Sequence, residues 1–159
     1  MRQSIWACCA LMLVATPVVA QPVPLASEAA RFQAQDLFNL EVASDPQISP
    51  DGSRIVYVRQ TADIMTDRMR PTIWMIDVRT GQQSPLVASA GSHSQPRWSP
   101  DGTRVAYIST AEGGRAQLFV RWIESGESVR VTNLPNTPTG LSWSPDGTKI
   151  AYSVLVAGQ

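Results

Sequence analysis

The chain has 159 residues, and 43% of them are hydrophobic, which is enough for the core of one ordinary domain. Its 13 lysines and arginines balance 13 aspartates and glutamates, so it lacks the basic surplus that nucleic acids and anionic membranes select. We therefore expect neither kind of partner.

Residues 1–20 have the pattern of a secretory signal peptide. Arg2 supplies the positive charge, an apolar stretch follows over residues 5–14, and small or modest side chains occupy residues 18–20. The apolar stretch is too short to cross a bilayer, which takes about twenty residues. A buried N-terminal helix is the alternative, whereas lipidation at a leader cysteine would leave no room for an apolar region before it. The pattern predicts an exported protein, periplasmic or secreted, without membrane contact after cleavage.

Both cysteines, Cys8 and Cys9, lie within this leader. The chain from Gln21 onward can therefore form no disulfide, although export would take it to an oxidising compartment. His93 is the only histidine, which excludes a zinc site built from cysteine and histidine. We predict no metal site and no cofactor.

Residues 21–44 are predicted to hold a linker and a short helix. Pro22 and Pro24 are typical of a linker. From about residue 28 to residue 43, apolar side chains three or four apart favour a helix, and Asp45-Pro46 would end it.

The rest of the chain is dominated by a repeat. The tetrapeptide Ser-Pro-Asp-Gly occurs three times, and each copy follows a hydrophobic residue and precedes a short strand-like run that ends in tyrosine. In such a turn, proline presets φ, aspartate hydrogen-bonds the backbone two residues on, and glycine accepts a positive φ. Each copy is therefore predicted to join two antiparallel strands. The copies are residues 49–52, 99–102 and 144–147.

Two further strands complete each full unit, at residues 72–78 and 84–88 in the first and at 117–123 and 128–132 in the second. Four strands in each repeat of this length are typical of a propeller blade. The strands after the turns are apolar at consecutive positions, as in sheets covered on both faces. A two-sheet sandwich is the alternative, but it does not explain why one turn recurs with the same flanks.

The predicted fold is therefore all-β: an incomplete β-propeller of four-stranded antiparallel blades. Blade one would span residues 45–90, blade two 91–135, and a partial blade three 136–159. Propellers close with about four to eight blades. We therefore expect residues 45–159 to be the N-terminal part of a longer propeller.

No group of residues predicts catalysis. Gly-x-Ser-x-Gly, the string of a nucleophile elbow, is absent. Ser49, Ser99 and Ser144 begin the repeated turns and are expected to be structural, and the aspartates of the same turns would lie in separate blades, where they cannot share a metal ion. His93 is placed in a loop between blades, since sequence neighbours such as Ser92 and Ser94 rarely form a triad with a histidine. Gly113-Gly114 lacks the context of a phosphate loop and is predicted to be a turn.

Two features leave a choice open. Four tryptophans could form a stacking platform for sugars, but most of them occupy apolar strand positions, which favours packing between blades. Residues 59–70 are the one charged, irregular excursion; we expect a solvated loop, with contact to substrate or to another domain as the alternative. The tryptophans are Trp74, Trp98, Trp122 and Trp143.

Several segments together resemble the opening of bacterial serine peptidases of the prolyl oligopeptidase family, in particular the acylaminoacyl-peptidase and dipeptidyl-aminopeptidase-like branch. The resemblance covers almost all of the chain after the leader. The segments are residues 36–40, 44–52, 55–58, 63–68 and 93–98.

This resemblance implies an N-terminal propeller followed by a C-terminal α/β-hydrolase domain that carries serine, aspartate and histidine. The propeller of such proteins limits access to short peptides. The implied partners are that domain of the same parent chain and short peptide substrates. No residue of this chain matches the catalytic motif, so we assign none and expect the chain alone to be inactive.

Non-enzymatic propellers are the alternative. Periplasmic TolB-like proteins carry the same turn and serve protein–protein interaction, but they place a separate α/β domain before the first blade. Residues 21–44 are too few for such a domain. A lectin-like or scaffolding propeller is a third hypothesis.

Overall fold

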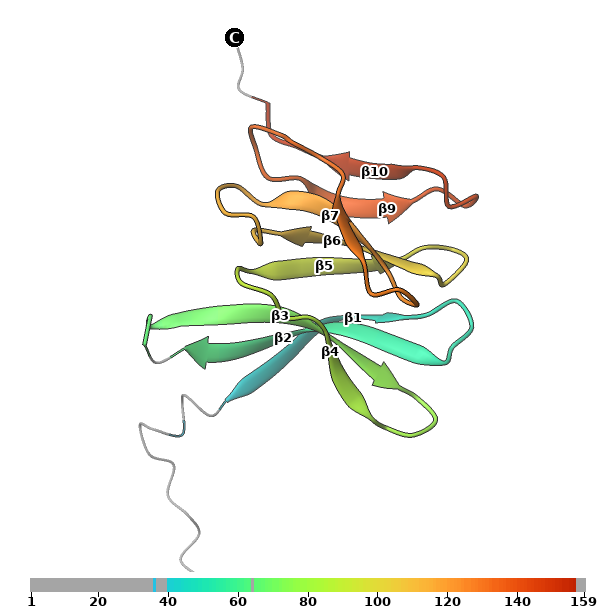
Figure 1. Ribbon diagram of the computed structural model, residues 1–159, viewed down its shortest axis with the longest axis horizontal. Helices are drawn as coiled ribbons and strands as arrows, with labels where there is room; N and C mark the ends of the chain where they lie inside the picture. Colours follow the sequence, from blue (N-terminus) through green and yellow to red (C-terminus); the bar gives the residue numbers. More distant parts are fainter. Residues whose placement is uncertain (1–35, 37–39, 64, 157–159) are drawn as a thin grey trace, which may run out of the picture. The chain divides into compact units, whose positions relative to one another are not determined.

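Each Ser-Pro-Asp-Gly segment forms a turn between two antiparallel strands in the computed structural model, which describes Asp36, residues 40–63 and residues 65–156 (Figure 1). Two sheets have four strands each, in the orders β1-β2-β3-β4 and β5-β6-β7-β8, and β9 pairs with β10 in a third. All neighbouring strands are antiparallel. The strands are β1 Glu41–Ile48, β2 Arg54–Asp63, β3 Arg68–Asp77, β4 Gln83–Val87, β5 His93–Trp98, β6 Arg104–Ser109, β7 Gln117–Trp122, β8 Ser128–Arg130, β9 Thr139–Trp143 and β10 Ile150–Ser153.

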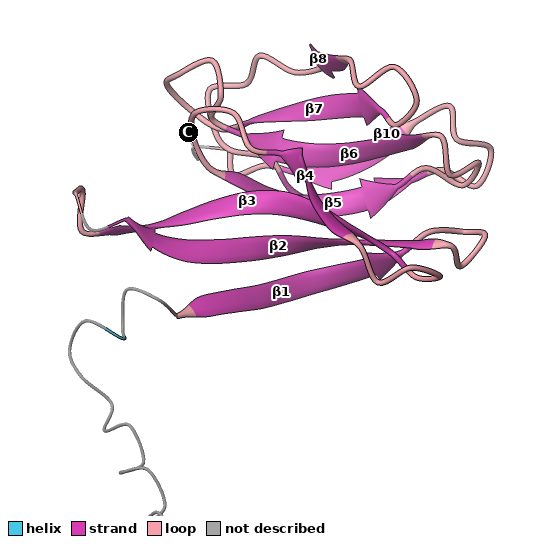
Figure 2. Ribbon diagram, turned by 60° about the horizontal axis from the view of Figure 1, so that its bottom comes forward, coloured by secondary structure: helices cyan, strands magenta, loops and turns pink. Residues whose placement is uncertain are grey.

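The three sheets pack face to face, as both ribbon views show (Figures 1 and 2). Between the first two sheets, Val56 and Ile73 meet Val105, Tyr107 and Phe119 in a buried cluster. A second cluster joins the second sheet to the third. It contains Ala106, Ile108, Leu118, Val120 and Leu141.

Sheets of four antiparallel strands that bury both faces against their neighbours are the blades of a propeller. The consecutive apolar residues of β6 explain this burial, because Val105 and Tyr107 face the first sheet while Ala106 and Ile108 face the third. The prediction of an all-β fold with four-stranded blades is confirmed for the described residues. None of the described segments contains a helix long and apolar enough to cross a membrane.

The predicted leader and most of the predicted helix lie outside the described residues. The helix prediction is wrong for residues 41–43, because these residues begin β1. Glu41 pairs with Thr61 and Ala43 with Arg59, so β1 is held by the extended end of β2. Asp45-Pro46 does not end a helix but forms an irregularity within β1.

The segment predicted as a charged loop, residues 59–70, is mostly sheet. β2 and β3 remain in register as far as the pair Asp63↔Arg68, so only the tip of this hairpin is a turn. The prediction failed because the segment lacks a run of apolar residues, whereas its backbone still pairs along the whole hairpin.

Candidate functional site

The side chains of the repeated turns are used within the turns. The Ser49 hydroxyl donates to Asp51 Oδ1 at 2.5 Å and accepts a hydrogen bond from the Arg54 amide at 2.9 Å. Asp51 also accepts from the Ser53 amide at 3.1 Å. These hydrogen bonds, above all those from Ser49 and Ser53, lower the pKa of Asp51 to about 2. Ser99 with Asp101 and Ser144 with Asp146 repeat this arrangement.

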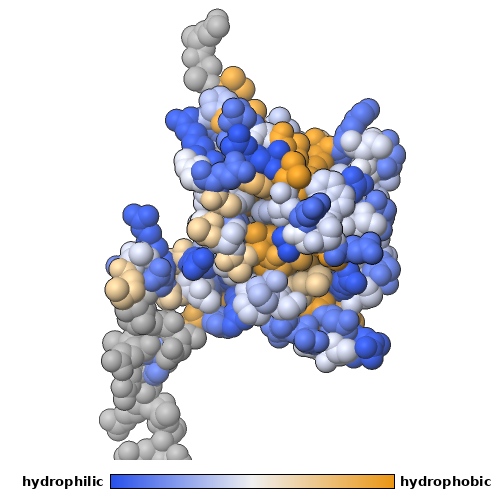
Figure 3. All heavy atoms as spheres, in the orientation of Figure 1, coloured by the Kyte–Doolittle hydropathy of each residue, from blue (hydrophilic) through white to orange (hydrophobic). Residues whose placement is uncertain are grey.

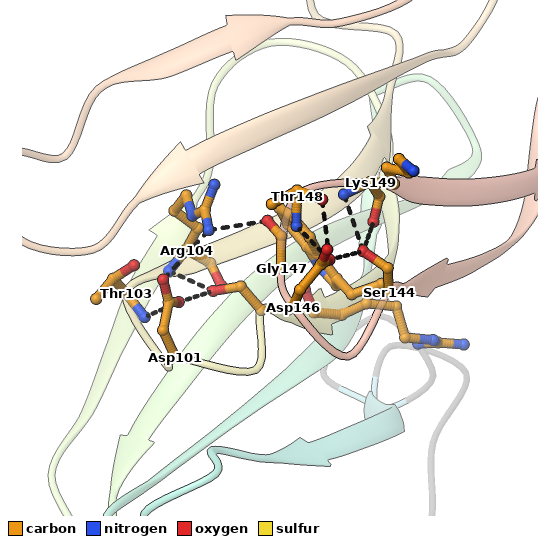
Figure 4. A network of polar contacts seen from close by, with 11 residues as sticks. Asp101, Thr103, Arg104, Ser144, Asp146, Gly147, Thr148 and Lys149 are labelled. Atoms are coloured by element: carbon orange, nitrogen blue, oxygen red, sulfur yellow. Dashed lines mark hydrogen bonds and ion pairs between the residues drawn. The ribbon is translucent and has the colours of Figure 1, made fainter.

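The turns of neighbouring blades also contact one another (Figure 4). The Arg104 guanidinium donates to Asp101 of its own turn at 3.2 Å and to the Gly147 carbonyl of the next turn at 3.1 Å. It also lies over the ring of Trp143, 5.0 Å from the centroid. The backbone at Gly147 lies beside Pro100, so that a Cβ added there would be in ordinary van der Waals contact with the proline ring, at 3.5 Å. The repeated motif therefore shapes each hairpin and also fastens one blade to the next.

Two tryptophans cross the boundaries between blades. Trp98 Nε1 donates to the Gln47 carbonyl of the first blade at 3.1 Å, and Trp143 Nε1 donates to the Arg97 carbonyl of the second at 3.0 Å. Gln47 and Arg97 occupy equivalent positions, two residues before the turn serine. The contact is thus the same at both boundaries, as expected from packing between blades.

The other two tryptophans have different surroundings. The Arg59 guanidinium lies 4.2 Å from the centroid of Trp74, and Trp122 is partly exposed at the end of β7. Since Trp98 and Trp143 lie at different boundaries, these side chains do not form one stacking platform.

A third contact between blades involves the residue of positive φ in the first strand of each blade. Asp45, Gln95 and Gly140 are equivalent residues with φ values of 49°, 53° and 64°. Both Asp45 carboxylate oxygens accept from Arg97 Nη1 at 2.9 Å, and Gln95 Oε1 accepts from the Gly140 amide at 2.9 Å. Sequence reasoning missed these residues, although their constant distance from the turn serine was a usable signal.

The prediction that His93 lies in a loop between blades is wrong. His93 begins β5, where it pairs with Ser109 of β6. Its ring is fully buried. Nδ1 lies 2.9 Å from the Ser109 hydroxyl oxygen, and Nε2 lies 3.1 Å from the Ser89 carbonyl oxygen. It also meets the edge of Tyr107. Burial lowers the pKa of His93 below its usual value of 6.5. The arrangement favours a neutral structural histidine.

A surface hollow lies where the β2–β3 hairpin meets the connection from β4 to β5. It has a volume of about 590 Å³ and is lined by Asp63, Thr66, Arg68, Arg70 and residues 90–92, among others. Arg70 donates to the Ser89 carbonyl at 3.3 Å, which fixes one wall. Because its lining contains both acidic and basic side chains, Asp63 with Arg68 and Arg70, the hollow suits a polar ligand or a protein surface.

The other candidate residues form no chemical site. Gly113 and Gly114 have positive φ values in the turn between β6 and β7. Across residues 40–63 and 65–156, no three histidine, cysteine, aspartate or glutamate side chains lie close enough together to hold a metal ion.

This geometry, with repeated hairpins docked through their turns, defines a β-propeller protein. Residues 34–159 match the family described as the TolB beta propeller domain (PD40), and the chain belongs to that family.

Three relatives illustrate the range of the similarity. The chain is 36% identical over 102 residues to the "Uncharacterized peptidase YuxL" of Bacillus subtilis, an alignment that covers 64% of this chain. It superposes on an acylaminoacyl peptidase of Pyrococcus horikoshii with a TM-score of 0.61 at 20% identity over 74% of the chain. A putative TolB of Agrobacterium tumefaciens gives 0.56 at 20% identity, covering 71% of this chain and 38% of its own.

The matched region is a small part of the two peptidases, 16% of the Bacillus protein and 18% of the Pyrococcus chain. The resemblance to peptidase propellers that the sequence predicted is thereby confirmed. The two structural matches, at 20% identity, establish the fold alone.

Proposed function

We propose that this chain forms the first blades of the propeller of an exported serine peptidase that hydrolyses short peptides. The observation that carries the proposal is the 36% identity with a peptidase over 102 residues. In this proposal, residues 1–20 direct export, and a C-terminal α/β-hydrolase domain of the parent protein carries the catalytic serine, aspartate and histidine.

The role of the described residues is then to build the wall that restricts access to the active site. The turn contacts, the two tryptophans and the Asp45–Arg97 ion pair hold consecutive blades in a fixed orientation. A rigid ring of blades admits short, extended peptides and excludes folded proteins. The charged hollow beside the β2–β3 hairpin would contact the hydrolase domain or a peptide.

The test uses the full-length protein encoded by the reading frame that contains this sequence. Its hydrolysis of a short chromogenic peptide is compared with hydrolysis of the same cleavage site within a folded protein. We expect turnover of the short peptide and none of the folded substrate. Equal turnover of both would contradict the gating role, and no hydrolysis of any peptide would contradict the peptidase.

A TolB-like function in protein–protein interaction is the second candidate, favoured by the family match and by the likeness to the Agrobacterium protein. The two proposals differ in what the parent protein contains. A Gly-x-Ser-x-Gly segment with later aspartate and histidine supports the peptidase, whereas a parent without them supports a binding propeller.

A further inference from the structure

A second hollow, of about 420 Å³, lies on the boundary between the first two blades, each of which has all four strands. Its walls come from the end of β4 on one side and from β6, β7 and the start of β8 on the other. In the view of Figure 3, hydrophobic side chains reach the surface midway along the unit, at the height where these two sheets meet. The lining includes Leu86, Val87, Tyr107, Phe119, Arg121 and Ser128.

The apolar part of this hollow is already formed by packing between the blades. Tyr107 and Phe119 stack, with ring centroids 5.7 Å apart and an angle of 23° between the rings. Both rings belong to the buried cluster that also contains Leu86 and Val87 of β4. These side chains therefore offer a preformed apolar wall, as ligand sites usually do.

Arg121 adds a positive charge to the lining, at a position where the first blade has an apolar residue. Arg121 pairs with Val105 of β6, as Ile76 pairs with Ile55 of β2. Because residues two apart on a strand share a face, Arg121 points to the same side of its sheet as Phe119, toward the first blade. Arg121 thus departs from the repeat, and the packing of a blade does not require a cation there.

The hydrogen-bonding groups of the Arg121 guanidinium are only partly used. Nη1 donates to the Ser128 hydroxyl at 3.2 Å. Nε is buried and has no hydrogen-bond partner in the part of the chain that the structure describes. None of the ion pairs within that part involves Arg121. Since a buried cationic donor without a partner costs free energy, an acceptor that reached it would be bound favourably.

The unused donors lie on one edge of the guanidinium. Nε and Nη2 carry parallel N–H groups, which suit the two oxygens of one carboxylate. Gly126 leaves room beside this edge, because a Cβ there would lie only 3.3 Å from Arg121 Nη2. The acidic residue of the lining, Glu112, does not occupy it, since its carboxylate pairs with Arg130 Nη1 at 2.8 Å.

We propose that this hollow binds a ligand in which a carboxylate is joined to an apolar group, with the carboxylate on the Nε–Nη2 edge of Arg121 and the apolar group against Phe119 and Leu86. A peptide that ends in an apolar residue has this chemistry, and so does an acidic side chain beside an apolar one. The site lies between two four-stranded blades and does not rest on the peptidase activity of the proposed function.

The probes are N-acetylphenylalanine, its amide, and N-acetyl-aspartyl-phenylalaninamide, whose only carboxylate is the aspartate side chain. Each is titrated against the isotope-labelled chain while NMR follows the Nε–H signal of Arg121, which is assigned by its loss in Arg121→Gln. We expect N-acetylphenylalanine to shift this signal and to bind at least about tenfold more tightly than its amide. Tighter binding of the acid than of the aspartyl compound would support peptide C-termini as the natural ligand, and the reverse order would support acidic side chains.

Variants test whether Arg121 is the cause. Arg121→Gln should weaken the binding of N-acetylphenylalanine at least about tenfold. Arg79→Gln is the matched control, because it removes an exposed arginine of the first blade that is not in the lining, and it should bind as the unaltered chain does. Arg121→Ile introduces the residue type of the first blade, so it should melt as cooperatively as the unaltered chain while it no longer distinguishes the acid from the amide.

Three results would overturn the proposal: equal binding of the acid and the amide by the unaltered chain, an Arg121 signal that no carboxylate shifts, or equal weakening in Arg79→Gln. The first two are measured on the unaltered chain, so they hold whether or not a variant folds. None of these outcomes depends on hydrolysis, which the full-length protein reports separately.

Discussion

Trp98 Nε1 donates a hydrogen bond of 3.1 Å to the carbonyl oxygen of Gln47, and this bond joins the first strand of the second blade to the first strand of the first. The same bond runs from Trp143 to Arg97 at the next boundary. A contact that recurs at the spacing of the repeat is a property of how blades dock, and it can be tested one boundary at a time.

Replacing Trp98 by phenylalanine keeps an aromatic ring but removes the hydrogen bond to the Gln47 carbonyl. We expect the free energy of unfolding to fall by about 1 kcal/mol, the usual net contribution of one hydrogen bond. The measurement is urea unfolding. Trp122→Phe is the matched control, because Trp122 is partly exposed and makes no such bond, and it should change stability by less than half as much. Equal losses would contradict the role of the bond.

Asp45 combines a charge with a positive φ of 49°, and two substitutions separate these properties. Asn adopts such a φ readily but cannot pair ionically with Arg97, whereas alanine does neither. Asp45→Asn should lower the free energy of unfolding by about 0.5 kcal/mol and Asp45→Ala by about 1–2 kcal/mol. The loss in Asp45→Asn should shrink at high salt. If both variants were equally stable at all salt concentrations, backbone conformation would not matter at this position.

The turn aspartates should make stability depend on acid pH. The folded pKa of Asp51 is about 2 against an ordinary value of 3.8, so the carboxylate stabilises the fold above pH 3.8. This contribution is lost as the pH falls through that interval, and the melting temperature should fall with it. Ser49→Ala removes the main cause of the lowered pKa and should flatten this part of the curve. An unchanged curve in Ser49→Ala would contradict the assignment.

His93 should add a second pH dependence at higher pH. Its pKa is lowered by burial, so the unfolded chain takes up a proton before the folded one does as the pH falls below 6.5. The stability contributed by the neutral ring is therefore full above pH 6.5 and declines below it. His93→Gln should lower stability at neutral pH but remove this decline, as thermal melts over a pH series would show. A decline that persists in His93→Gln would have to come from another group.

The local turns of this fold and the packing of tryptophans between blades could be predicted from the sequence, but the particular pairs of residues that meet across a blade boundary could not. The Ser-Pro-Asp-Gly turns can be recognised in the sequence because the residues that interact in them, such as Ser49, Asp51 and Gly52, are only a few positions apart. Arg97 and Asp45 meet across 52 positions, and nothing in either residue type indicates the other.

The errors have a related cause. Apolar spacing predicts a helix that reaches residue 43, and charged residues predict a loop over residues 59–70, whereas pairing between β1, β2 and β3 decides both segments. The only reason in the sequence for placing His93 in a loop between blades is that its serine neighbours are poor candidates for a triad. Its place in β5 depends on β6, which follows it in the chain.

The most direct test of the central proposal is to treat this chain and its full-length parent side by side with a serine-reactive fluorophosphonate probe. The account predicts that the parent is labelled at the serine of a Gly-x-Ser-x-Gly segment, that its Ser→Ala variant is not, and that the 159-residue chain is not labelled at all. Labelling of the isolated chain, or a folded parent that remains unlabelled and inactive on short peptides, would contradict the assignment of these blades to a serine peptidase.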